Sequence, residues 1–330
     1  MYFWPTEQRK VIEQMLQNVK QQGRVDEFAV FDADNTLWEF DLEESLLVWL
    51  EYRGLISLSQ INPSLFPIPP KEKESVWDYY QRLCSWDHSI CYLWAVQALG
   101  GFCLEQLKFE VDAMMQFDDP KGIPTTQNQE IHYIPVPKIF RGQQDLLEQL
   151  RSFNIEPWVV SASAEEVVRM VVSDPKYGLH IKPEHVIGVN LLLMYPNGTI
   201  ISSAEEGKKG CRGDFFASSD RKKAKLTHHV YAPMTWYGGK LAAIKEWIHP
   251  SKRPILVAGD SPNDFFMQFY TDVQQQGIRL RIHRKESHRE QLRQAIKKRQ
   301  SVLQPSDPQP EKGWVEVTPM ELHYQHHPFV

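Results

Sequence analysis

The sequence predicts an α/β protein built on a parallel sheet, and three short apolar runs carry this prediction. The runs cover residues 28–31, 158–160 and 254–258, and each is followed by a plausible helical pattern. Continuous apolar runs that alternate with helices are typical of buried parallel strands. Each run leads to a polar residue; these residues are Asp32, Ser161 and, after Gly259, Asp260. Because ligands bind beyond the carboxyl ends of parallel strands, we expect the functional site at this edge.

Further elements follow from local spacing. Apolar residues at helical intervals predict a helix from about residue 6 that ends at Gly23. The Asn197–Gly198 pair predicts a hairpin turn, and residues 314–317 predict a final strand after a proline-rich linker. The basic run 279–299 predicts mainly a solvated helix face, with anion binding as the alternative.

The spacing of the first two strands predicts an inserted domain. The first run ends at residue 31 and the second begins at residue 158, whereas a crossover needs only about a dozen residues. We therefore assign residues 41–137 to an insert and residues 1–40 and 138–330 to the core. The insert is expected to be helical, with helices at 42–50, 76–83, 90–99 and 104–115. The prolines between residues 117 and 140 predict a hinge segment at its exit.

The composition excludes several classes of protein. The chain has 330 residues, of which 42% are hydrophobic and 24% charged, as in an ordinary globular protein. A net charge of −5 does not fit a general nucleic-acid-binding protein, and the sequence holds no apolar run of about 18 residues that would span a membrane. The first residues lack a signal-peptide pattern, which favours a cytoplasmic protein; an exported, periplasmic mature chain is the alternative. The oligomeric state stays open.

The cysteines indicate neither a disulfide framework nor a zinc site. They are few and scattered, and none has zinc-finger spacing; they are Cys84, Cys91, Cys103 and Cys211. We expect them to be buried or free thiols.

The polar residues beyond the strands predict phosphoryl transfer from a monoester. They comprise two carboxylate pairs, a hydroxyl and an amine: Asp32, Asp34, Asp260, Asp264, Ser161 and Lys240. Paired carboxylates bind a hard cation, with Mg²⁺ the best fit and Mn²⁺ not distinguishable by its ligands. A hydroxyl and an ammonium hold phosphate oxygens, and a carboxylate can attack phosphorus once its charge repulsion is neutralised. Asp34 would protonate the leaving oxygen and then take a proton from water.

This order of motifs resembles that of the haloacid dehalogenase (HAD) superfamily. The motifs are DxDxT at residues 32–36, Ser161, Lys240 and GDxxxD at residues 259–264, and the second aspartate is typical of its phosphatases. The resemblance implies a Rossmann-like core with a parallel sheet and an inserted helical cap. It implies Asp32 as the nucleophile, which forms an aspartyl-phosphate, and Asp34 as the general acid and base.

The same resemblance implies the ligands of metal and phosphate. Mg²⁺ would be held by Asp32, Asp260 and the backbone carbonyl of Asp34, and Asp264 would support the metal shell or Lys240. The implied phosphate-binding residues are Thr36, Ser161, Ala162 and Lys240.

Within that superfamily, five segments are similar to the bacterial phosphorylcholine phosphatases. They are FDADNTLWEFDLEESLLVWLE, YYQRLCSWDHSICYLW, RMVVSDPKYGLHIKPEHVIGV, TWYGGKLAAI and RPILVAGDSP. The similarity runs from about residue 28 to residue 285 and implies a small cationic alcohol phosphate as substrate, with phosphorylcholine first. Phosphoserine, phosphoethanolamine or another small metabolite are alternative substrates. A binding or effector protein that keeps the HAD fold without catalysis is the alternative of another class.

The insert supplies candidates for recognition of a cationic head group, which aromatic faces and nearby carboxylates bind. The candidate substrate-binding residues are Glu44, Trp38, Tyr80, Trp86 and Asp87. The aromatic residues could equally form the core of the insert. Glu44 resembles a choline anchor, but its spacing from Asp41 also fits a helix start. A carboxylated substrate would need a cationic partner such as Arg53 or Arg82.

Overall fold

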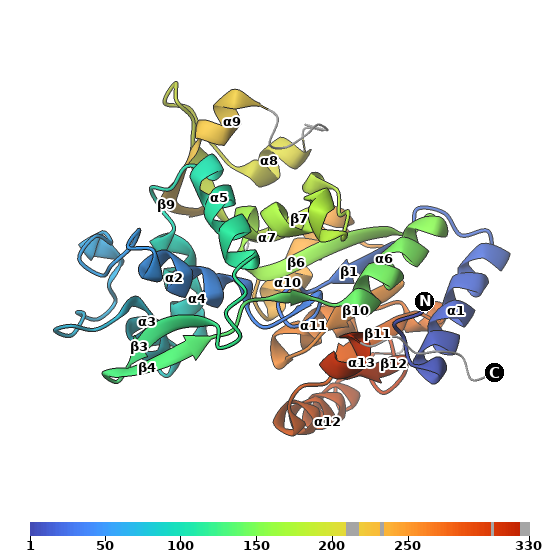
Figure 1. The fold of residues 1–330 in the computed structure, drawn as a ribbon. Coiled ribbons are helices and arrows are strands. Elements are labelled where there is room, and N and C mark those ends of the chain that lie inside the picture. The colour runs from blue at the N-terminus through green and yellow to red at the C-terminus, as the bar shows by residue number, and fades with distance from the viewer. Residues whose placement is uncertain (209–217, 232–233, 305–306, 324–330) are drawn as a thin grey trace.

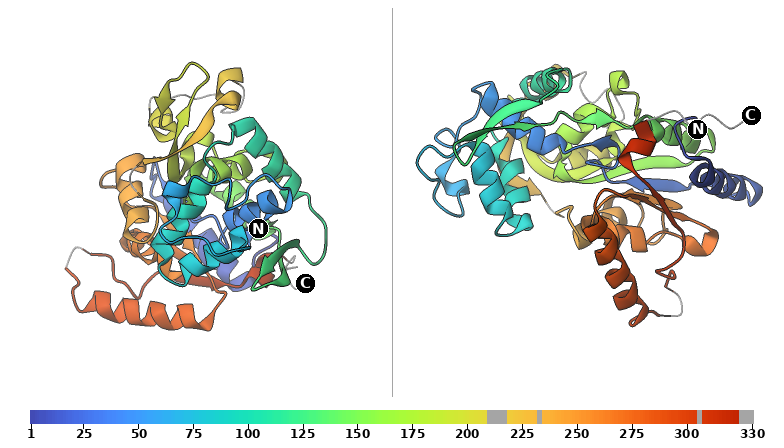
Figure 2. Two further views of the ribbon diagram at one scale, coloured as in Figure 1. Left: turned by 90° about the vertical axis from the view of Figure 1, so that its left-hand side faces the viewer. Right: turned by 60° about the horizontal axis from the view of Figure 1, so that its bottom comes forward.

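The structure, a computed structural model, describes residues 1–208, 218–231, 234–304 and 307–323. A central sheet lies between helices, and the insert extends from one side of it, while helix α1 (Thr6–Gln21) lies at the far end (Figure 1, Figure 2). Among the described helices, none combines the length and the apolar character needed to cross a membrane.

Eight described strands form the central sheet in the order β12-β11-β10-β1-β6-β7-β8, and β9 also pairs with β7. The pairs from β12 to β7 are parallel, whereas β8 and β9 run antiparallel to β7. The strands are β1 (Phe28–Phe31), β6 (Glu156–Ala164), β7 (Val186–Met194), β8 (Ile200–Ile201), β9 (Lys225–Tyr231), β10 (Leu256–Gly259), β11 (Ile278–Ile282) and β12 (Trp314–Val317). The predicted α/β fold with a Rossmann-like parallel sheet is confirmed.

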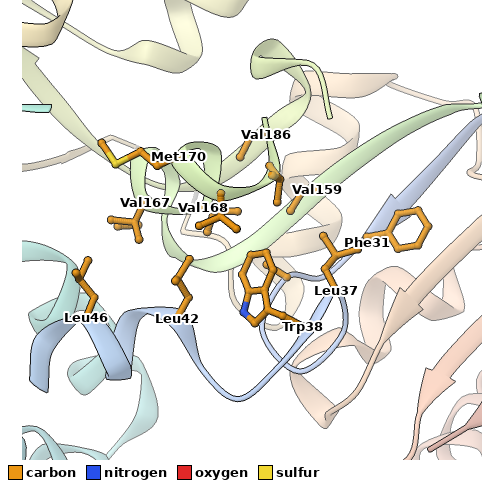
Figure 3. Packing of buried hydrophobic residues seen from close by; sticks show 14 of the residues in the cluster. Phe31, Leu37, Trp38, Leu42, Leu46, Val159, Val167, Val168, Met170 and Val186 are labelled. Atoms are coloured by element: carbon orange, nitrogen blue, oxygen red, sulfur yellow. The ribbon is translucent and has the colours of Figure 1, made fainter. Parts of the chain in front are cut away.

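Both faces of the sheet are buried, which explains why its central strands are continuous apolar runs. Phe31 of β1 and Val159 of β6 pack in one cluster, which Figure 3 shows, and Val30 packs in a second cluster on the other face. The helices of the core are α1, α6 (Arg141–Ser152), α7 (Glu165–Val172), α8 (Ser203–Lys208), α9 (Ser219–Lys223), α10 (Gly238–Ala243), α11 (Phe265–Phe269), α12 (Glu286–Gln300) and α13 (Pro319–His323).

The insert leaves and re-joins the core through a short two-stranded sheet. Strand β2 (Trp38–Glu39) pairs antiparallel with β5 (Lys138–Ile139). The backbone of Phe40, which follows β2, has a φ of 72°, and its N–H donates to Asn35 Oδ1 at 3.1 Å. Because a bulky residue adopts this left-handed conformation only under constraint, the start of the insert is locked to the loop after β1.

The four helices predicted for the insert are present. They are α2 (Leu42–Tyr52), α3 (Val76–Cys84), α4 (His88–Ala98) and α5 (Leu104–Met115). The exit segment is different from the prediction, because β3 (Ile123–Gln127) and β4 (Glu130–Ile134) form an antiparallel hairpin there. Its turn residues, Asn128 and Gln129, both have positive φ, as a two-residue hairpin turn requires.

The basic run was predicted as a solvated helix face, and its first part is not one. Arg279 and Arg281 lie in β11 and are buried. The guanidinium of Arg279 donates to the backbone carbonyls of Gln309, Pro310 and Lys312. The aliphatic residues that alternate with these arginines form the strand, and only α12 fits the prediction. The predicted hairpin at Asn197–Gly198 and the final strand are confirmed.

The prediction of free thiols is wrong for two cysteines. Cys84 and Cys91 form a disulfide bridge, with their Cα atoms 5.0 Å apart. Helix α3 ends at Cys84 and α4 begins at His88, so the corner between the helices brings the two residues together. Cys103 is free, and Cys211 lies outside the described residues.

Candidate active site

The strand order brings the polar strand ends together, because β1 lies between β10 and β6. The register places Phe31 beside Ala258 and Val159, and the N–H of Asp32 donates to the carbonyl of Ala258 at 3.0 Å. Asp32, Ser161 and Asp260 therefore lie at neighbouring carboxyl ends of parallel strands. The strand ends that carry these polar residues are adjacent, as the sequence predicted.

A buried ammonium group connects two of the carboxylates. Lys240 Nζ donates to Asp32 Oδ1 and to Asp264 Oδ1, at 2.6 Å in each case. Lys240 and Asp264 are fully buried and Asp32 nearly so. Burial opposes the charge of Lys240, but the carboxylates of Asp264 and Asp32 outweigh it and raise the pKa of the amine. Lys240 thus stays protonated and balances the negative charge of these two carboxylates.

Two glycines permit this close approach. A Cβ on Gly239 would lie 1.6 Å from the carbonyl oxygen of Met234, and one on Gly259 would lie 2.5 Å from the Cβ of Asp264. Asp264 accepts from the backbone N–H groups of Asp260 and Ser261 at 2.9 and 3.1 Å. The GDxxxD segment is therefore a tight turn whose last carboxylate holds the turn and Lys240 together.

The carboxylates fit a divalent cation. Asp32, Asp260 and Asp264 each offer one oxygen, and these oxygens lie within 4.8 Å of one another. A hard cation such as Mg²⁺ prefers an all-oxygen set of this kind. Asp260 Oδ2 also accepts from the guanidinium of Arg284 at 2.7 Å. Burial raises the pKa of Asp260 to about 6, although the guanidinium of Arg284 lowers it. A bound cation would stabilise this carboxylate and its neighbours in their charged form.

Asp34 has a different environment from Asp32. Its Oδ1 accepts from the Trp38 indole at 2.9 Å and from the backbone N–H of Leu42 at 2.7 Å, and its Oδ2 accepts from the Ser163 hydroxyl at 2.6 Å. Burial raises the pKa of Asp34, and these hydrogen bonds oppose the rise. A carboxyl with a raised pKa that is held in one orientation suits a general acid.

The serines in the last part of β6 lie where its pairing with β7 is irregular. The register between β6 and β7 shifts between Val160 and Ala164. Ser161 is fully buried, and its Oγ accepts from the N–H of Ser163 at 3.2 Å. Thr36 is also fully buried, and its Oγ1 has no partner among the described residues. Ala162 and Ser163 line the pocket above the carboxylates.

The pocket has a volume of about 500 Å³, and its walls differ in charge. The insert contributes an acidic and aromatic wall, formed by Asp41, Glu43, Glu44, Tyr80, His88 and Tyr92. The segment after β11 contributes a basic wall, formed by Arg284, Lys285 and His288. The floor includes Asp32, Asp34 and Asp260, so the insert covers the carboxylate cluster.

The position of the Glu44 side chain distinguishes between the two interpretations of this residue. Asp41 is the N-cap of α2, and its Oδ1 accepts from the N–H of Glu44 at 2.9 Å. The Glu44 carboxylate faces the pocket, where it accepts from the Tyr80 hydroxyl at 3.0 Å. Burial raises the pKa of Glu44, while the hydrogen bond from Tyr80 lowers it. The helix start therefore uses the side chain of Asp41, and the Glu44 carboxylate lines the pocket beside Tyr80.

Three of the predicted substrate-binding residues lie elsewhere. Trp38 is buried and donates its indole N–H to Asp34, so it supports the carboxyl rather than offering a face to substrate. Trp86 is 60% exposed and does not line the pocket. Asp87 is the N-cap of α4, where it accepts from the N–H of Ser89 at 2.8 Å. Asp87 is used to cap α4, and Trp86 is exposed at the corner between α3 and α4, so neither side chain lines the pocket.

The two arginines considered for a carboxylated substrate are also engaged elsewhere. Arg53 lies 3.7 Å from Glu110, and Arg82 lies 2.7 Å from Glu74. The basic groups that do line the pocket, Arg284 and Lys285, come from the basic run, for which anion binding was the alternative interpretation.

Sequence reasoning missed Glu43, which joins the insert to the core. Its Oε2 accepts from the backbone N–H of Ala164, after the β6 serines, at 2.6 Å. Burial raises the pKa of Glu43 to about 8. The adjacent Glu43–Glu44 pair was the available signal, because consecutive acids at a helix start point in different directions.

A Rossmann-like sheet with this carboxylate and lysine site, and with an insert above it, defines a phosphoryl-transfer hydrolase of the HAD type. No family model matches the chain. Phosphorylcholine phosphatase from Pseudomonas aeruginosa is 37% identical over 97% of the chain and 92% of that protein. The chain therefore belongs to the phosphorylcholine phosphatase family of HAD-superfamily phosphatases.

Solved structures share the fold. A conserved protein of unknown function from Anaerococcus prevotii superposes with a TM-score of 0.57, at 19% identity over 90% of this chain and 92% of that one. A substrate-bound phosphoserine phosphatase superposes with a TM-score of 0.42 at 13% identity over 82% of this chain and 97% of that one, a likeness too weak to bear on the substrate.

We expect Glu43→Gln to remove part of the pH dependence of stability. The Glu43 carboxyl titrates near pH 8 in the folded protein, but an unfolded glutamate ionises near its ordinary value of 4.5. Between these values the unfolded state releases its proton first, so the wild-type free energy of unfolding falls as pH rises. From pH 6 to pH 8, wild type should lose about 2 kcal/mol more than the variant.

The measurement is urea unfolding at both pH values. Glu72→Gln, at an exposed position of the insert, is the matched control and should follow wild type. Parallel pH profiles for wild type and Glu43→Gln would show that Glu43 is not held neutral.

Proposed function

We propose that this phosphatase hydrolyses phosphorylcholine in a Mg²⁺-dependent reaction through an aspartyl-phosphate on Asp32. The observation that carries the proposal is the Glu44–Tyr80 pair on the pocket wall that faces the carboxylate cluster. In this proposal, residues 41–137 form the cap that recognises the leaving group, and residues 1–40 and 138–330 form the catalytic core.

In the first step, a carboxylate oxygen of Asp32 attacks the phosphorus atom of the ester. The bond between phosphorus and the choline oxygen breaks as the new bond forms. Asp34 donates a proton to the departing oxygen, a role that its raised pKa favours, while three hydrogen bonds fix the orientation of its carboxyl. Lys240 offsets the charge on the phosphoryl oxygens, and the Ser161 hydroxyl donates a hydrogen bond to one of them.

In the second step, water attacks the phosphorus of the aspartyl-phosphate. Asp34, now ionised, takes the proton of that water, and the bond between Asp32 and phosphorus breaks. Inorganic phosphate leaves, and both aspartates return to their starting states. The same carboxyl serves as acid and then as base, which requires the fixed position that Ser163, Trp38 and Leu42 give it.

Asp32, Asp260 and the backbone carbonyl of Asp34 would hold the cation, with Asp264 orienting Lys240 and the turn. The resemblance to the superfamily implies the backbone carbonyl of Asp34 as the third ligand, while its carboxyl serves as acid and base. When bound, Mg²⁺ supplies positive charge that offsets the repulsion between a phosphate dianion and the carboxylates.

The unlike walls of the pocket support a cationic leaving group. A quaternary ammonium has no hydrogen-bond donor on its cationic head, so carboxylates and aromatic faces bind it best. Glu44, Tyr80 and Tyr92 provide both on the cap side. Phosphoserine is the second candidate, because Arg284 and Lys285 line the pocket and would contact a carboxylate.

We expect Asp32→Asn to lower kcat for p-nitrophenyl phosphate by at least about a thousandfold, because an amide does not attack phosphorus. The measurement is phosphate release with Mg²⁺, alongside the thermal unfolding midpoint. Because asparagine keeps the shape, the midpoint should stay near that of wild type. Activity equal to wild type would disprove the assignment of Asp32 as the nucleophile.

The metal prediction is tested by binding as well as by activity. Chelation with EDTA should abolish phosphate release, and added Mg²⁺ should restore it. Asp260→Asn should weaken Mg²⁺ binding in calorimetry by about tenfold or more, because one carboxylate oxygen is lost from the cluster. Unchanged affinity in that variant would place the cation elsewhere.

The substrate prediction concerns Glu44→Gln. Loss of the carboxylate charge should raise KM for phosphorylcholine about tenfold and leave KM for p-nitrophenyl phosphate within about twofold. Glu105→Gln, at an exposed position of α5, is the matched control. A panel with phosphoethanolamine and phosphoserine ranks the alternatives. Equal losses on phosphorylcholine and p-nitrophenyl phosphate would indicate a structural role for Glu44.

A further inference from the structure

The disulfide bridge lies at the corner that joins α3 to α4. Cys84 is the last residue of α3, and Cys91 lies one turn into α4. His88 lies beside both sulfur atoms, and together the three side chains could hold a metal ion only if the cysteines were reduced. The bridge uses both sulfurs, so the corner is closed covalently.

The bridge lies next to the aromatic wall of the pocket. Tyr80 precedes Cys84 by four residues, which places the two on the same face of α3, one turn apart. Tyr92 directly follows Cys91 in α4, and both tyrosines line the pocket. The bridge therefore fixes the spacing between the two helices that supply these rings.

The Glu44 carboxylate depends on the same corner. The hydroxyl of Tyr80 donates to Glu44 Oε1 at 3.0 Å, across from α3 to α2. A shift of α3 relative to α2 would change this hydrogen bond, and a shift of α3 relative to α4 would change the separation of the two rings. The groups around Asp32, in contrast, come from β1, β6, α10 and the turn after β10, all in the core.

The bridge acts locally. It joins residues only seven positions apart, and the constraint that a disulfide imposes grows with the length of the loop it closes. Its removal should loosen the α3–α4 corner much more than the sheet that carries Asp32.

We propose that the Cys84–Cys91 bridge sets the selectivity for a quaternary ammonium group by fixing Tyr80 and Tyr92 around Glu44. This inference rests on the proposed function, whose cationic leaving group it places between these rings. The bridge does not take part in the transfer of phosphate; it holds the cap residues that contact the leaving group.

Formation of the bridge is a two-electron oxidation. Each thiol loses a proton, the sulfurs join, and a disulfide oxidant such as oxidised glutathione accepts the electrons and protons to become two thiols. Such bridges persist in oxidising compartments. The inference therefore favours the exported, periplasmic alternative over the cytoplasmic location that the sequence pattern predicts.

The test compares a Cys84→Ser, Cys91→Ser double variant with wild type and with Cys103→Ser, which changes the free cysteine. The probe is choline itself, as a competitive inhibitor of p-nitrophenyl phosphate hydrolysis. The inhibition constant should rise about fivefold in the double variant, while kcat and KM for p-nitrophenyl phosphate stay within about twofold. Cys103→Ser should match wild type. An unchanged inhibition constant, or an equal loss in both measurements, would overturn the proposal.

If the double variant does not fold, reversible reduction of the Cys84–Cys91 bridge in wild type provides a second test. Dithiothreitol should raise the inhibition constant of wild type, oxidised glutathione should restore it, and Cys103→Ser should respond in the same way. Alkylation of both Cys84 and Cys91 in oxidised protein, detected by peptide mapping, would show that the bridge does not form and would also overturn the proposal.

These outcomes are separable from failure of the proposed function. Turnover of phosphorylcholine by wild type tests the function, whereas the ratio of choline inhibition constants is measured on a different substrate. Turnover without a change in that ratio would leave the function standing and reject the role of the bridge. Choline that does not inhibit wild type at any concentration would reject the cationic site itself, and this inference with it.

Discussion

The buried ammonium of Lys240 between Asp32 and Asp264 is the interaction on which the rest of the site depends. An ion that is removed from water costs several kcal/mol unless partners compensate, and two carboxylates at 2.6 Å provide that compensation. Such partners must be placed accurately, which explains the surrounding backbone. Gly239 and Gly259 allow the approach, and the tight turn after β10 aims Asp264 at the amine. Loss of Lys240 would leave these two buried carboxylates without their shared counter-charge.

A second set of contacts links this core to the insert. The backbone N–H of Leu42, at the start of α2, donates to Asp34, and the next residue, Glu43, accepts from Ala164. Figure 3 shows Leu42 and Trp38 against the apolar residues of β6 and α7. The insert therefore supplies one of the three hydrogen bonds to Asp34, and Trp38 and Ser163 supply the other two.

The parts of the fold that follow from local pattern could be predicted from the sequence. Buried parallel strands are apolar runs, and their polar successors mark the site, so Asp32, Ser161 and Asp260 were accessible to that reasoning. The hairpin of β3 and β4 was not predicted, because the prolines in this segment indicated a hinge. Arg279 and Arg281 could not be predicted as strand residues because fully buried arginines are rare. Arg279 donates to backbone carbonyls, and Arg281 lies 3.6 Å from Glu316.

The details of the pocket were harder to predict because they depend on tertiary contacts. Trp38 carries an aromatic face, but only the fold shows that its indole N–H is committed to Asp34. The pairing of Cys84 with Cys91 depends on the angle at which two helices meet, which spacing alone does not give. Glu44 was identified as a candidate from the sequence. Only its hydrogen bond with Tyr80 in the structure shows that its carboxylate faces the pocket and does not cap the helix.

The pairing of β2 with β5 has a consequence for the evolution of such enzymes. The chain leaves and re-joins the core at adjacent antiparallel strands, so the ends of the insert lie side by side. A segment with neighbouring ends can be lengthened, shortened or exchanged without altering the sheet that it interrupts. One catalytic sheet can thus acquire different recognition modules, as long as each new module begins with a helix whose first N–H groups reach the acid at the strand end.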